Sequence, residues 1–246
     1  MRVDYAEISL QGAREENQDR VTAAVSEDAA LLVLLDGMGG HAQGERAAEL
    51  ARKVLVERFW HTPQPLMDPL GFLHLALGQA HEEVAIMGAS LPMEQRPRAT
   101  CAVCLVQEGT AWWAHMGDSR IYLLRDGIVR RRTRDHSHVE VLLQEGLITE
   151  AQAQNHPMRN FVECCLGGDR ILPEMQVARL QRVQQGDLLL VCSDGFWSNL
   201  SDQDMTASLF SGIPLRDALA ALADEAVQRG GAGSDNTSAA VLRLMD

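Results

Sequence analysis

Short apolar runs separated by glycine, proline and acidic residues are the main pattern along the chain. Runs of four to eight apolar or alternating residues, bounded by turn formers, predict β-strands. On this basis we expect strands at residues 3–9, 21–25, 30–35, 99–107, 110–116, 121–124, 128–133, 161–166, 176–180, 187–192 and 238–244. The Asp-Gly pair between residues 125 and 128 favours a tight antiparallel hairpin.

Apolar residues at helical spacing predict helices between these strands. Helices are expected at residues 44–59, 70–87, 139–145, 149–155, 201–210 and 214–229. In the first of them, Ala47, Val54 and Phe59 fall on one face. Pro214 suits the first turn of the last helix. The stretch from Thr149 to Gln152 matches a capping box.

The order of these elements indicates the fold class. Strands, two helices, strands, a polar segment, strands, two helices and a last strand follow one another, without the strict alternation of a parallel β-α-β fold. Two antiparallel sheets packed face to face, flanked by helix pairs, accommodate this order as an α+β, four-layer α-β-β-α sandwich. The polar segment at about residues 137–160 is expected to form a flap over the core. Residues 1–246 show no linker and are expected to form a single domain.

Acidic residues stand at the ends of several predicted strands. The apolar run from Leu31 to Leu35 stops at Asp36, which Gly37 follows, and Asp194 precedes a glycine in the same way. An aspartate in such a place commonly forms a turn or caps a helix. Alternatively, a carboxylate beside a bare backbone carbonyl is a hard oxygen site suited to Mg²⁺ or Mn²⁺.

Four aspartates considered together favour the metal interpretation. Asp19, Asp36, Asp194 and Asp235 each lie next to a predicted strand end. If the four converge, their mutual repulsion requires cations to offset it. Two divalent ions a few ångströms apart serve phosphoester hydrolysis, because water between them becomes hydroxide near neutral pH and attacks phosphorus in line. The chain has no Gly-x-Ser-x-Gly elbow that would indicate a serine nucleophile.

Composition narrows the classes of function. The 246 residues are 46% hydrophobic and carry a formal net charge of -12 at pH 7. This acidic balance argues against nucleic acid and anionic membranes as partners. No apolar run approaches the ~20 residues that span a bilayer, and the first residues lack the apolar core of a signal peptide, so a cytoplasmic location is expected. Cys101 and Cys104 have Cys-x-x-Cys spacing without a second zinc-ligand pair, which predicts reduced core cysteines.

Five short motifs in a fixed order carry a family resemblance. They are Arg14 with Asn17-Gln18-Asp19, Asp36-Gly37-Met38-Gly39-Gly40-His41, Gly117-Asp118-Ser119-Arg120, Ser193-Asp194-Gly195 and Ser234-Asp235-Asn236. In this order they resemble the metal-dependent type 2C (PPM) serine/threonine protein phosphatases in their short bacterial form, over nearly the whole chain. The resemblance implies a β-sandwich flanked by helix pairs. It also implies hydrolysis of phosphoserine and phosphothreonine on proteins by a hydroxide that bridges two divalent metal ions.

The resemblance further implies which residues hold the metal ions. Asp36 would bridge two Mn²⁺ or Mg²⁺ ions. The Gly37 carbonyl would ligate one of these ions, and Asp194 and Asp235 would hold the other. Asp118 would recruit a weaker third ion.

Two more residues are implied to support the site. Asp19 would support the metal site either through a water molecule or through contacts with the residues that ligate the ions. Arg14 would bind the substrate phosphate, because a planar guanidinium can pair with two phosphate oxygens at once. A surface ion pair between Arg14 and Glu15 or Glu16 is the alternative.

Two positions depart from the pattern of some family members. Met38 stands where many eukaryotic members carry a histidine proposed as the general acid, and a thioether cannot donate a proton. His41 or metal-bound water would then protonate the leaving group, and a structural role for His41 is the alternative. Gln18 replaces an acidic residue beside Asp19, which removes one negative charge near the second ion.

Three functional hypotheses follow. The first is a monomeric signalling phosphatase that acts on phosphorylated proteins and opposes a cognate bacterial Ser/Thr kinase. The second is a module that binds phosphoprotein or metal without turnover, although the intact Asp36, Asp194 and Asp235 argue against it. The third is a two-metal phosphoesterase with a small-molecule substrate. A basic stretch with Arg96 and Arg98 is expected either to contact acidic or phosphorylated substrate or to be a solvated loop.

Overall fold

Two antiparallel sheets form the centre of the molecule. The computed structural model describes residues 1–38, 43–154, 156–159 and 161–245. One sheet has the strand order β1-β12-β11-β7-β8, and the other has the order β10-β6-β5-β3-β4-β9 with β2 beside β3. The strands are β1 (Val3–Leu10), β2 (Asp19–Val25), β3 (Ala29–Met38), β4 (Arg98–Ala99), β5 (Cys101–Gln107), β6 (Thr110–Met116), β7 (Arg120–Arg125), β8 (Ile128–Arg132), β9 (Leu166–Gly167), β10 (Gln176–Arg182), β11 (Leu188–Cys192) and β12 (Thr237–Leu244).

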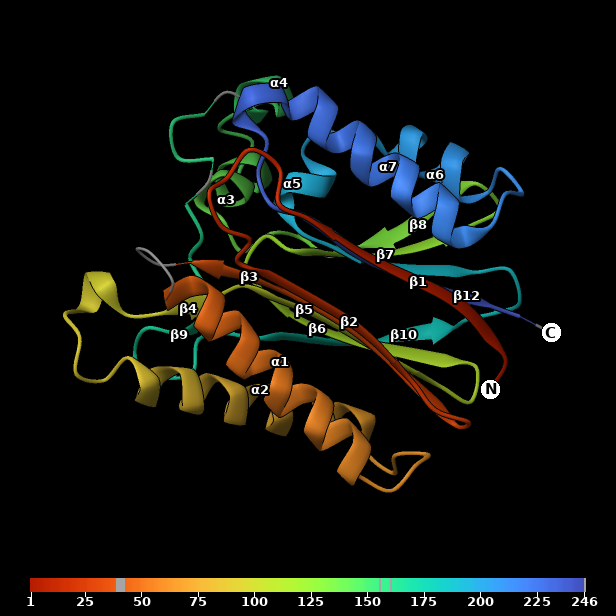
Figure 1. Cartoon of the computed structure of the whole chain (residues 1–246), viewed down its shortest axis with the longest axis horizontal. Helices are drawn as coiled ribbons and strands as arrows, with labels where there is room; N and C mark the ends of the chain where they lie inside the picture. The colour runs from red at the N-terminus through yellow and green to blue at the C-terminus, as the bar shows by residue number, and fades with distance from the viewer. Residues whose placement is uncertain (39–42, 155, 160, 246) are drawn as a thin grey trace.

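A pair of helices covers the outer face of each sheet. Figure 1 shows α1 and α2 against the sheet that contains β3, and α6 and α7 against the sheet that contains β12. The helices are α1 (Gln43–His61), α2 (Pro69–Met87), α3 (His138–Gln144), α4 (Glu150–Gln154), α5 (Asp194–Trp197), α6 (Asp202–Leu209) and α7 (Leu215–Gly230), with short 3₁₀ turns at Met93–Gln95 and Gly231–Gly233. This arrangement confirms the predicted four-layer α-β-β-α sandwich.

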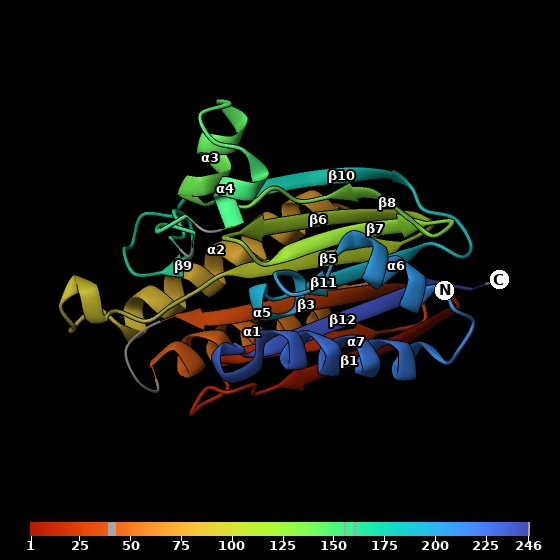
Figure 2. The same cartoon turned by 90° about the horizontal axis from the view of Figure 1, so that it is seen from above.

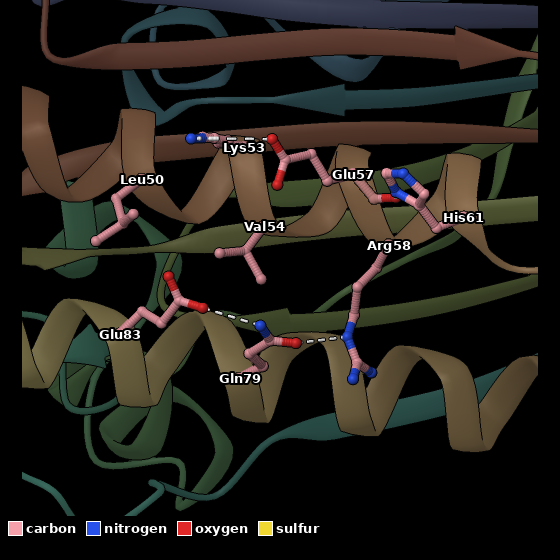
Figure 3. Close-up of a pocket in the computed structure, with 8 residues that line it drawn as sticks. All are labelled: Leu50, Lys53, Val54, Glu57, Arg58, His61, Gln79 and Glu83. Carbon is pink, nitrogen blue, oxygen red and sulfur yellow. Dashed lines mark hydrogen bonds and ion pairs between the residues drawn. The ribbon is translucent and has the colours of Figure 1, made fainter.

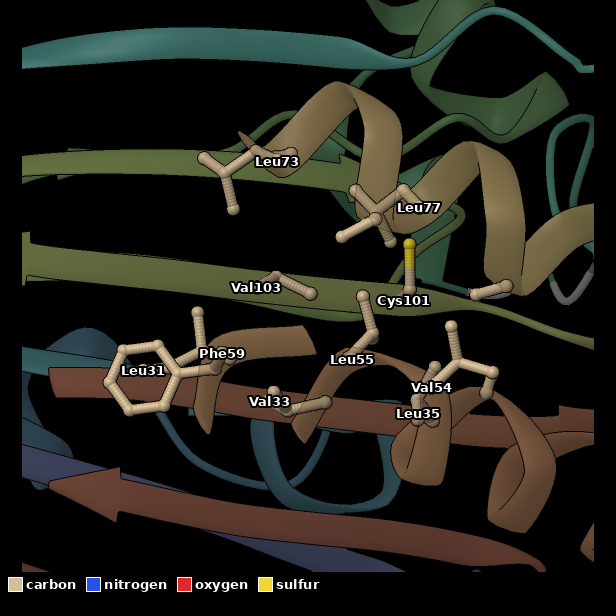
Figure 4. Close-up of a cluster of buried hydrophobic side chains, with 14 of the residues drawn as sticks. Leu31, Val33, Leu35, Val54, Leu55, Phe59, Leu73, Leu77, Cys101 and Val103 are labelled. Atoms are coloured by element: carbon tan, nitrogen blue, oxygen red, sulfur yellow. The ribbon is translucent and has the colours of Figure 1, made fainter. Parts of the chain in front are cut away.

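Three apolar layers hold the four structural layers together. On β3, Leu31, Val33 and Leu35 pack against α1 and α2 (Figure 4). The alternate residues Leu32 and Leu34 pack between the two sheets. Because successive strand residues point to opposite faces, a strand buried on both faces must be apolar at every position. This requirement explains the uninterrupted apolar run that ends at Asp36.

Local capping fixes where several helices begin. Asp68 accepts a hydrogen bond from the Gly71 amide at 2.9 Å at the start of α2. The predicted capping box at α4 is present: the Thr149 amide donates to the Gln152 side chain at 2.8 Å, and the Gln152 amide donates back to the Thr149 hydroxyl at 3.4 Å. Reciprocal bonds of this kind satisfy amides that have no partner inside a helix.

One predicted strand is wrong. Within residues 161–166, Val162 forms an isolated bridge with Ser137, and only the two-residue β9 follows. Phe161 is 52% exposed, so the apolar run does not pack as a core strand. Gly167 and Gly168 have positive φ angles, which turn the chain instead of extending it.

Helices α3 and α4 occupy the segment expected to be a flap. Figure 2 shows them projecting beyond the two sheets at one end of the sandwich. The same end carries the Asp36 terminus of β3 (Figure 1). Whether this segment moves over a substrate stays a prediction. Among the residues that the structure describes, no helix is both long and apolar enough to cross a membrane.

Candidate active site

The predicted acidic residues lie where strands of both sheets end. Asp19 and Asp36 face each other across the β2–β3 pair. Asp194 begins α5 directly after β11, and Asp235 lies just before β12, which pairs with β11. Asp118 occupies the turn between β6 and β7. The two sheets therefore bring to one end of the sandwich carboxylates that are far apart in the sequence.

The electrostatics of Asp36 are those of a carboxyl group with other acidic side chains around it. The pKa of Asp36 is raised well above its ordinary value by burial first, and then by the charges of Asp19, Asp194, Asp118 and Asp235. A carboxyl group resists ionisation when like charges surround it in a site of low polarity. Added positive charge, such as that of divalent cations, would favour the ionised form of every member of the cluster.

Neighbouring members of the cluster are shifted in the same direction. Burial raises the pKa of Asp118 to about 8, with a further contribution from Asp194. Burial also raises the pKa of Asp19 to about 7, against the effect of nearby serine hydroxyls. The pKa of Asp194 rises to about 6 through burial and the charge of Asp235. Such a group of perturbed carboxylates in one place is typical of a functional site.

Asp19 provides a separate sign that the site is built for a cation. The residue is 2% exposed, and among the described residues neither carboxylate oxygen makes a hydrogen bond of regular geometry, although the Ser193 and Ser238 hydroxyls lie near enough to lower its pKa. Buried polar atoms nearly always have partners, so an orphaned pair of oxygens requires an explanation. A bound divalent ion with its water shell would supply that partner, and carboxylates are the donors that Mg²⁺ and Mn²⁺ prefer.

The predicted ligands lie at one end of the sandwich, but their side chains do not converge on a single point in this structure. Among the described residues, no group of three or more His, Cys, Asp and Glu side chains is arranged to hold an ion. The donor set fits a divalent ion in chemistry and charge, while the ligand roles of Asp36, Gly37, Asp118, Asp194 and Asp235 stay predictions.

Gly37 is required by packing at the end of β3. A Cβ atom there would collide with the carbonyl oxygens of Gly44 and Gln18. The Gly37 amide donates to the Gln18 carbonyl at 3.2 Å. The absent side chain thus allows the start of α1 and the loop before β2 to approach the residue after Asp36.

Arg14 binds a carboxylate of the cluster rather than its neighbours in the sequence. Its Nε and Nη2 atoms donate to the two carboxylate oxygens of Asp235, at 2.8 and 2.6 Å. This planar, two-point pairing is also the way in which a guanidinium binds phosphate. The expected alternative, an ion pair with Glu15 or Glu16, is wrong. The Arg14 side chain is 58% exposed, so it is open to a ligand.

Asn236 holds the loop that carries Arg14, and the sequence did not reveal this role. Its Oδ1 atom accepts a hydrogen bond from the Gln18 amide at 2.8 Å. Its Nδ2 atom donates to the carbonyls of Gln11 and Glu16, at 2.8 and 2.9 Å. The only sequence signal for Asn236 was its place directly after Asp235, in a motif that predicted a role for the aspartate alone.

A buried ion pair holds the turn that carries Asp118. Arg120 donates to both oxygens of Asp135, each at 2.8 Å. The Arg120 guanidinium also lies 3.3 Å from the centre of the Trp197 ring, and Trp197 Nε1 donates to the Asp118 carbonyl at 2.9 Å. A planar cation that stacks on an aromatic ring and pairs with a carboxylate is strongly oriented. Neither Asp135 nor Trp197 had been assigned a role from the sequence.

The predictions for His41 and for the two core cysteines have different outcomes. His41 lies outside the described residues, so its role as an acid stays a prediction. Met38 is the last residue of β3 and is half-buried. Cys101 and Cys104 are free and fully buried, which confirms them as core cysteines.

Cys164 and Arg170 have the Cys-x5-Arg spacing of some phosphate-binding loops. However, burial and the charges of Glu163 and Glu174 raise the pKa of the Cys164 thiol. A nucleophilic cysteine requires the opposite shift, because the thiolate is the reactive form. This shift in pKa does not favour Cys164 as the nucleophile of a cysteine phosphatase.

A groove of about 270 Å³ lies away from the carboxylates, between α1 and α2 (Figure 3). Its polar side chains pair with one another: Arg58 donates to Gln79 at 2.5 Å, and Gln79 donates to Glu83 at 2.9 Å. The groove therefore presents satisfied groups and no convergent reactive ones, so the strand ends remain the candidate site.

Comparison with known proteins defines the class. The family model described as protein phosphatase 2C matches residues 11–230. The chain therefore belongs to the protein phosphatase 2C family, which confirms the resemblance seen in the five motifs.

Particular relatives are bacterial phosphatases. The chain is 34% identical over 243 residues to the serine/threonine protein phosphatase PstP of Mycobacterium tuberculosis, covering 98% of this chain and 45% of PstP. It thus spans less than half the length of that relative. It is 31% identical over 241 residues to the protein phosphatase PhpP of Streptococcus pneumoniae, covering 94% of this chain and 93% of PhpP.

Solved structures share the fold over nearly the whole chain. The serine/threonine phosphatase of S. agalactiae superposes with a TM-score of 0.90 and 27% identity, covering 99% of this chain and 100% of that one. The catalytic domain of PstP in complex with two manganese ions superposes with a TM-score of 0.84 and 30% identity, covering 99% of each chain. The layers and strand order described above are therefore those of phosphatase structures.

Proposed function

We propose that this chain is a metal-dependent phosphatase that hydrolyses phosphoserine and phosphothreonine on proteins. The observation that carries the proposal is the Asp36 cluster, in which aspartates from separate strand ends raise one another's pKa. Family membership and the manganese complex of PstP support the same conclusion. We further propose that its substrates are those of a cognate Ser/Thr kinase and that it acts as a monomer in the cytoplasm.

The residues that would hold the metal ions are those at the strand ends. Asp36 would lie between two Mn²⁺ or Mg²⁺ ions, the Gly37 carbonyl would face one ion, and Asp194 and Asp235 would face the other. Asp118 would face a weaker third ion. When bound, these ions would supply positive charge that offsets the repulsion among the carboxylates. They would also activate water for attack on phosphorus.

Asp19 would have a supporting role behind Asp36. It lies opposite Asp36 in the β2–β3 pair and is buried without a hydrogen bond of regular geometry among the described residues. In this position its carboxylate would accept hydrogen bonds from water that surrounds an ion, and so orient the ligands.

Arg14 would bind and orient the phosphate. In this structure its two donors are engaged by Asp235. If Asp235 turns its oxygens toward a metal ion, the guanidinium becomes free for two phosphate oxygens with the same planar geometry. One side chain would thus exchange a carboxylate for the substrate, and substrate binding would depend on the metal.

Protonation of the leaving hydroxyl requires a donor other than Met38. A thioether sulfur carries no proton, and Met38 occupies the end of β3 beside the site. His41 follows three residues later in the chain and is our candidate, with metal-activated water as the alternative.

The test is hydrolysis of a phosphothreonine peptide by the purified chain with EDTA, Mg²⁺ or Mn²⁺, and an aryl phosphate as the small-molecule reference. Asp36→Asn should lower kcat by at least about a hundredfold, because it removes a charge that ions require. Circular dichroism should show an unchanged fold. Full activity in this variant, or in EDTA, would refute the metal mechanism. Hydrolysis of the aryl phosphate alone would favour the small-molecule hypothesis, and no hydrolysis at all would favour the binding module.

A further inference from the structure

A three-stranded ribbon extends β3 beyond the acidic cluster. Gly37 and Met38 at the end of β3 pair with Ala99 and Arg98 of β4. Arg98 in turn pairs with Gly167 of β9. Figure 1 shows β4 and β9 together at the end of the β3 arrow. Arg98 therefore lies in the middle of a ribbon that borders the candidate site.

The ribbon has one apolar face, and the other face of β4 continues the face of β3 that carries Asp36. Ala99 and Leu166 belong to the apolar layer beneath α1 and α2. Since strand residues alternate and directly opposed residues share a face, Arg98 lies on the other face, together with Asp36. On that face the Thr100 hydroxyl lies 2.6 Å from the Ser119 hydroxyl, next to Asp118.

This register sets how far Arg98 lies from the reacting centre. Thr100 stands across from Asp36, with its amide bonded to the Asp36 carbonyl at 2.9 Å. Arg98 is two residues further along the ribbon, which corresponds to about 7 Å at the usual rise of a strand. The backbone of Arg98 is thus one row outside the Asp36 row, and its guanidinium reaches from there to the Met93 carbonyl.

The Arg98 side chain is held in place by backbone. Its Nη2 atom donates to the Met93 carbonyl at 2.8 Å. Its Nε atom lies 2.6 Å from where a Cβ of Gly168 would be, so the stem passes directly over this glycine. Arg96 is also bonded to carbonyls, those of Leu91 and Gly168, each at 3.1 Å.

The charges of Arg96 and Arg98 are not compensated. Within the described part of the chain, neither guanidinium has a carboxylate within 4.0 Å. By contrast Arg14, Arg120 and Arg125 each pair with an aspartate. In a chain with a net charge of -12, two oriented and unpaired guanidiniums beside a phosphate site form a local attraction for anions.

We infer that Arg98 determines substrate specificity by binding an acidic or phosphorylated side chain close to the residue being dephosphorylated. This inference rests on the proposed function. An extended peptide advances about 3.3 Å per residue. The row of Arg98, about 7 Å along the ribbon from the row of Asp36, is therefore level with a peptide residue two or three positions from the one being dephosphorylated. Arg96 adds positive charge behind Arg98, and its bonds to carbonyls hold the segment in position.

The experiment compares matched phosphothreonine peptides that carry Glu or Gln two or three positions from the phosphothreonine, on either side. In the wild-type chain with Mn²⁺, Glu at one of these positions should raise kcat/KM about two- to five-fold over Gln, the range of an exposed ion pair. Sodium chloride should reduce this ratio through screening.

Variants identify the residue responsible. Arg98→Met keeps a long stem over Gly168 and should abolish the preference for Glu, whereas Arg98→Lys should retain part of it. The matched control is Arg216→Met on α7. Arg216 is exposed and lies in the first turn of α7, whereas Asp235 follows the opposite end of this 16-residue helix. This control should keep the full preference.

Two results would overturn the inference: no preference for Glu at any position in the wild type, or the same preference in Arg98→Met. Because each variant is judged by a ratio of two peptides, a general loss of activity does not mimic the result. If the wild type cleaves none of the peptides with any metal, the proposed function itself fails. If it cleaves all of them equally, only the role of Arg98 fails.

Discussion

Two arginine–aspartate pairs at the same end of the molecule have the same geometry and different surroundings. Arg120 and Asp135 pair through two hydrogen bonds, with side chains only 13% and 10% exposed. Arg14 and Asp235 also pair through two hydrogen bonds, but with side chains 58% and 33% exposed. Burial therefore separates a pair that fixes structure from one that can exchange partners.

The neighbours of each pair support this distinction. The Arg120 pair is enclosed by Trp197, and it fixes the turn at Asp118. The Arg14 pair instead meets the carboxylate cluster: Asp194 and Asp36 help to raise the pKa of Arg14, and Arg14 lowers the pKa of Asp194. Arg14 is thus a cation that partly offsets the acidic cluster when no metal is bound.

The largest expected effect comes from breaking the buried pair. Asp135→Ala leaves the Arg120 charge buried without its partner and should cost about 3–5 kcal/mol of unfolding free energy. Asp235→Ala breaks the exposed pair and also removes a like charge from the cluster, so it should change stability by less than about 1 kcal/mol. Urea unfolding followed by circular dichroism measures both. Equal losses in the two variants would show that burial does not distinguish the pairs.

A smaller effect is the pH dependence of the metal-free protein. The folded pKa values of Asp194, Asp19 and Asp118, about 6, 7 and 8, lie above their ordinary values. These carboxyl groups bind more protons in the folded state, so they lower stability as pH rises. Burial lowers the pKa of His81, His115 and His136, which has the opposite effect up to about pH 6.5. Stability is therefore expected to fall as pH rises from about 6.5 to about 8. Thermal unfolding in EDTA at several pH values tests this.

Two comparisons separate the causes of this dependence of stability on pH. Saturating Mn²⁺ should flatten it, because bound cations favour the ionised carboxylates. Arg14→Ala should steepen it, because Arg14 lowers the pKa of Asp194. Stability that rises from about pH 6.5 to about pH 8 in EDTA, above the range in which the buried histidines change charge, would contradict the clustering of the carboxylates.

The sequence predicted features that depend on local pattern. The apolar run before Asp36 is buried on both faces of β3, and such a strand has no alternative to being apolar. The box at Thr149 depends on residues three apart. The acidic ends of the strands were also visible, since each follows or precedes an apolar run.

Features that depend on long-range contacts were not predictable. The three hydrogen bonds of Asn236 join residues more than 200 positions apart in the chain. The pairing of Arg14 with Asp235 rather than with Glu15 depends on how two loops meet after folding. The error at residues 161–166 has a similar cause, because exposure of Phe161 is decided by tertiary packing. The single domain and the metal ligands stay predictions.

The smallest expected effect concerns competition between Arg14 and metal for Asp235. Both Asp235 oxygens accept from Arg14, so a metal ion must displace that pair. Arg14→Ala should tighten Mn²⁺ binding about two- to five-fold, as measured by isothermal titration calorimetry without substrate. Arg14→Lys keeps the charge but cannot form the planar two-point pair. If the lysine variant binds Mn²⁺ more tightly than wild type, the ion pair itself competes with the metal. If only the alanine variant does so, the effect is one of charge alone, and the exchange of partners proposed for Arg14 is wrong.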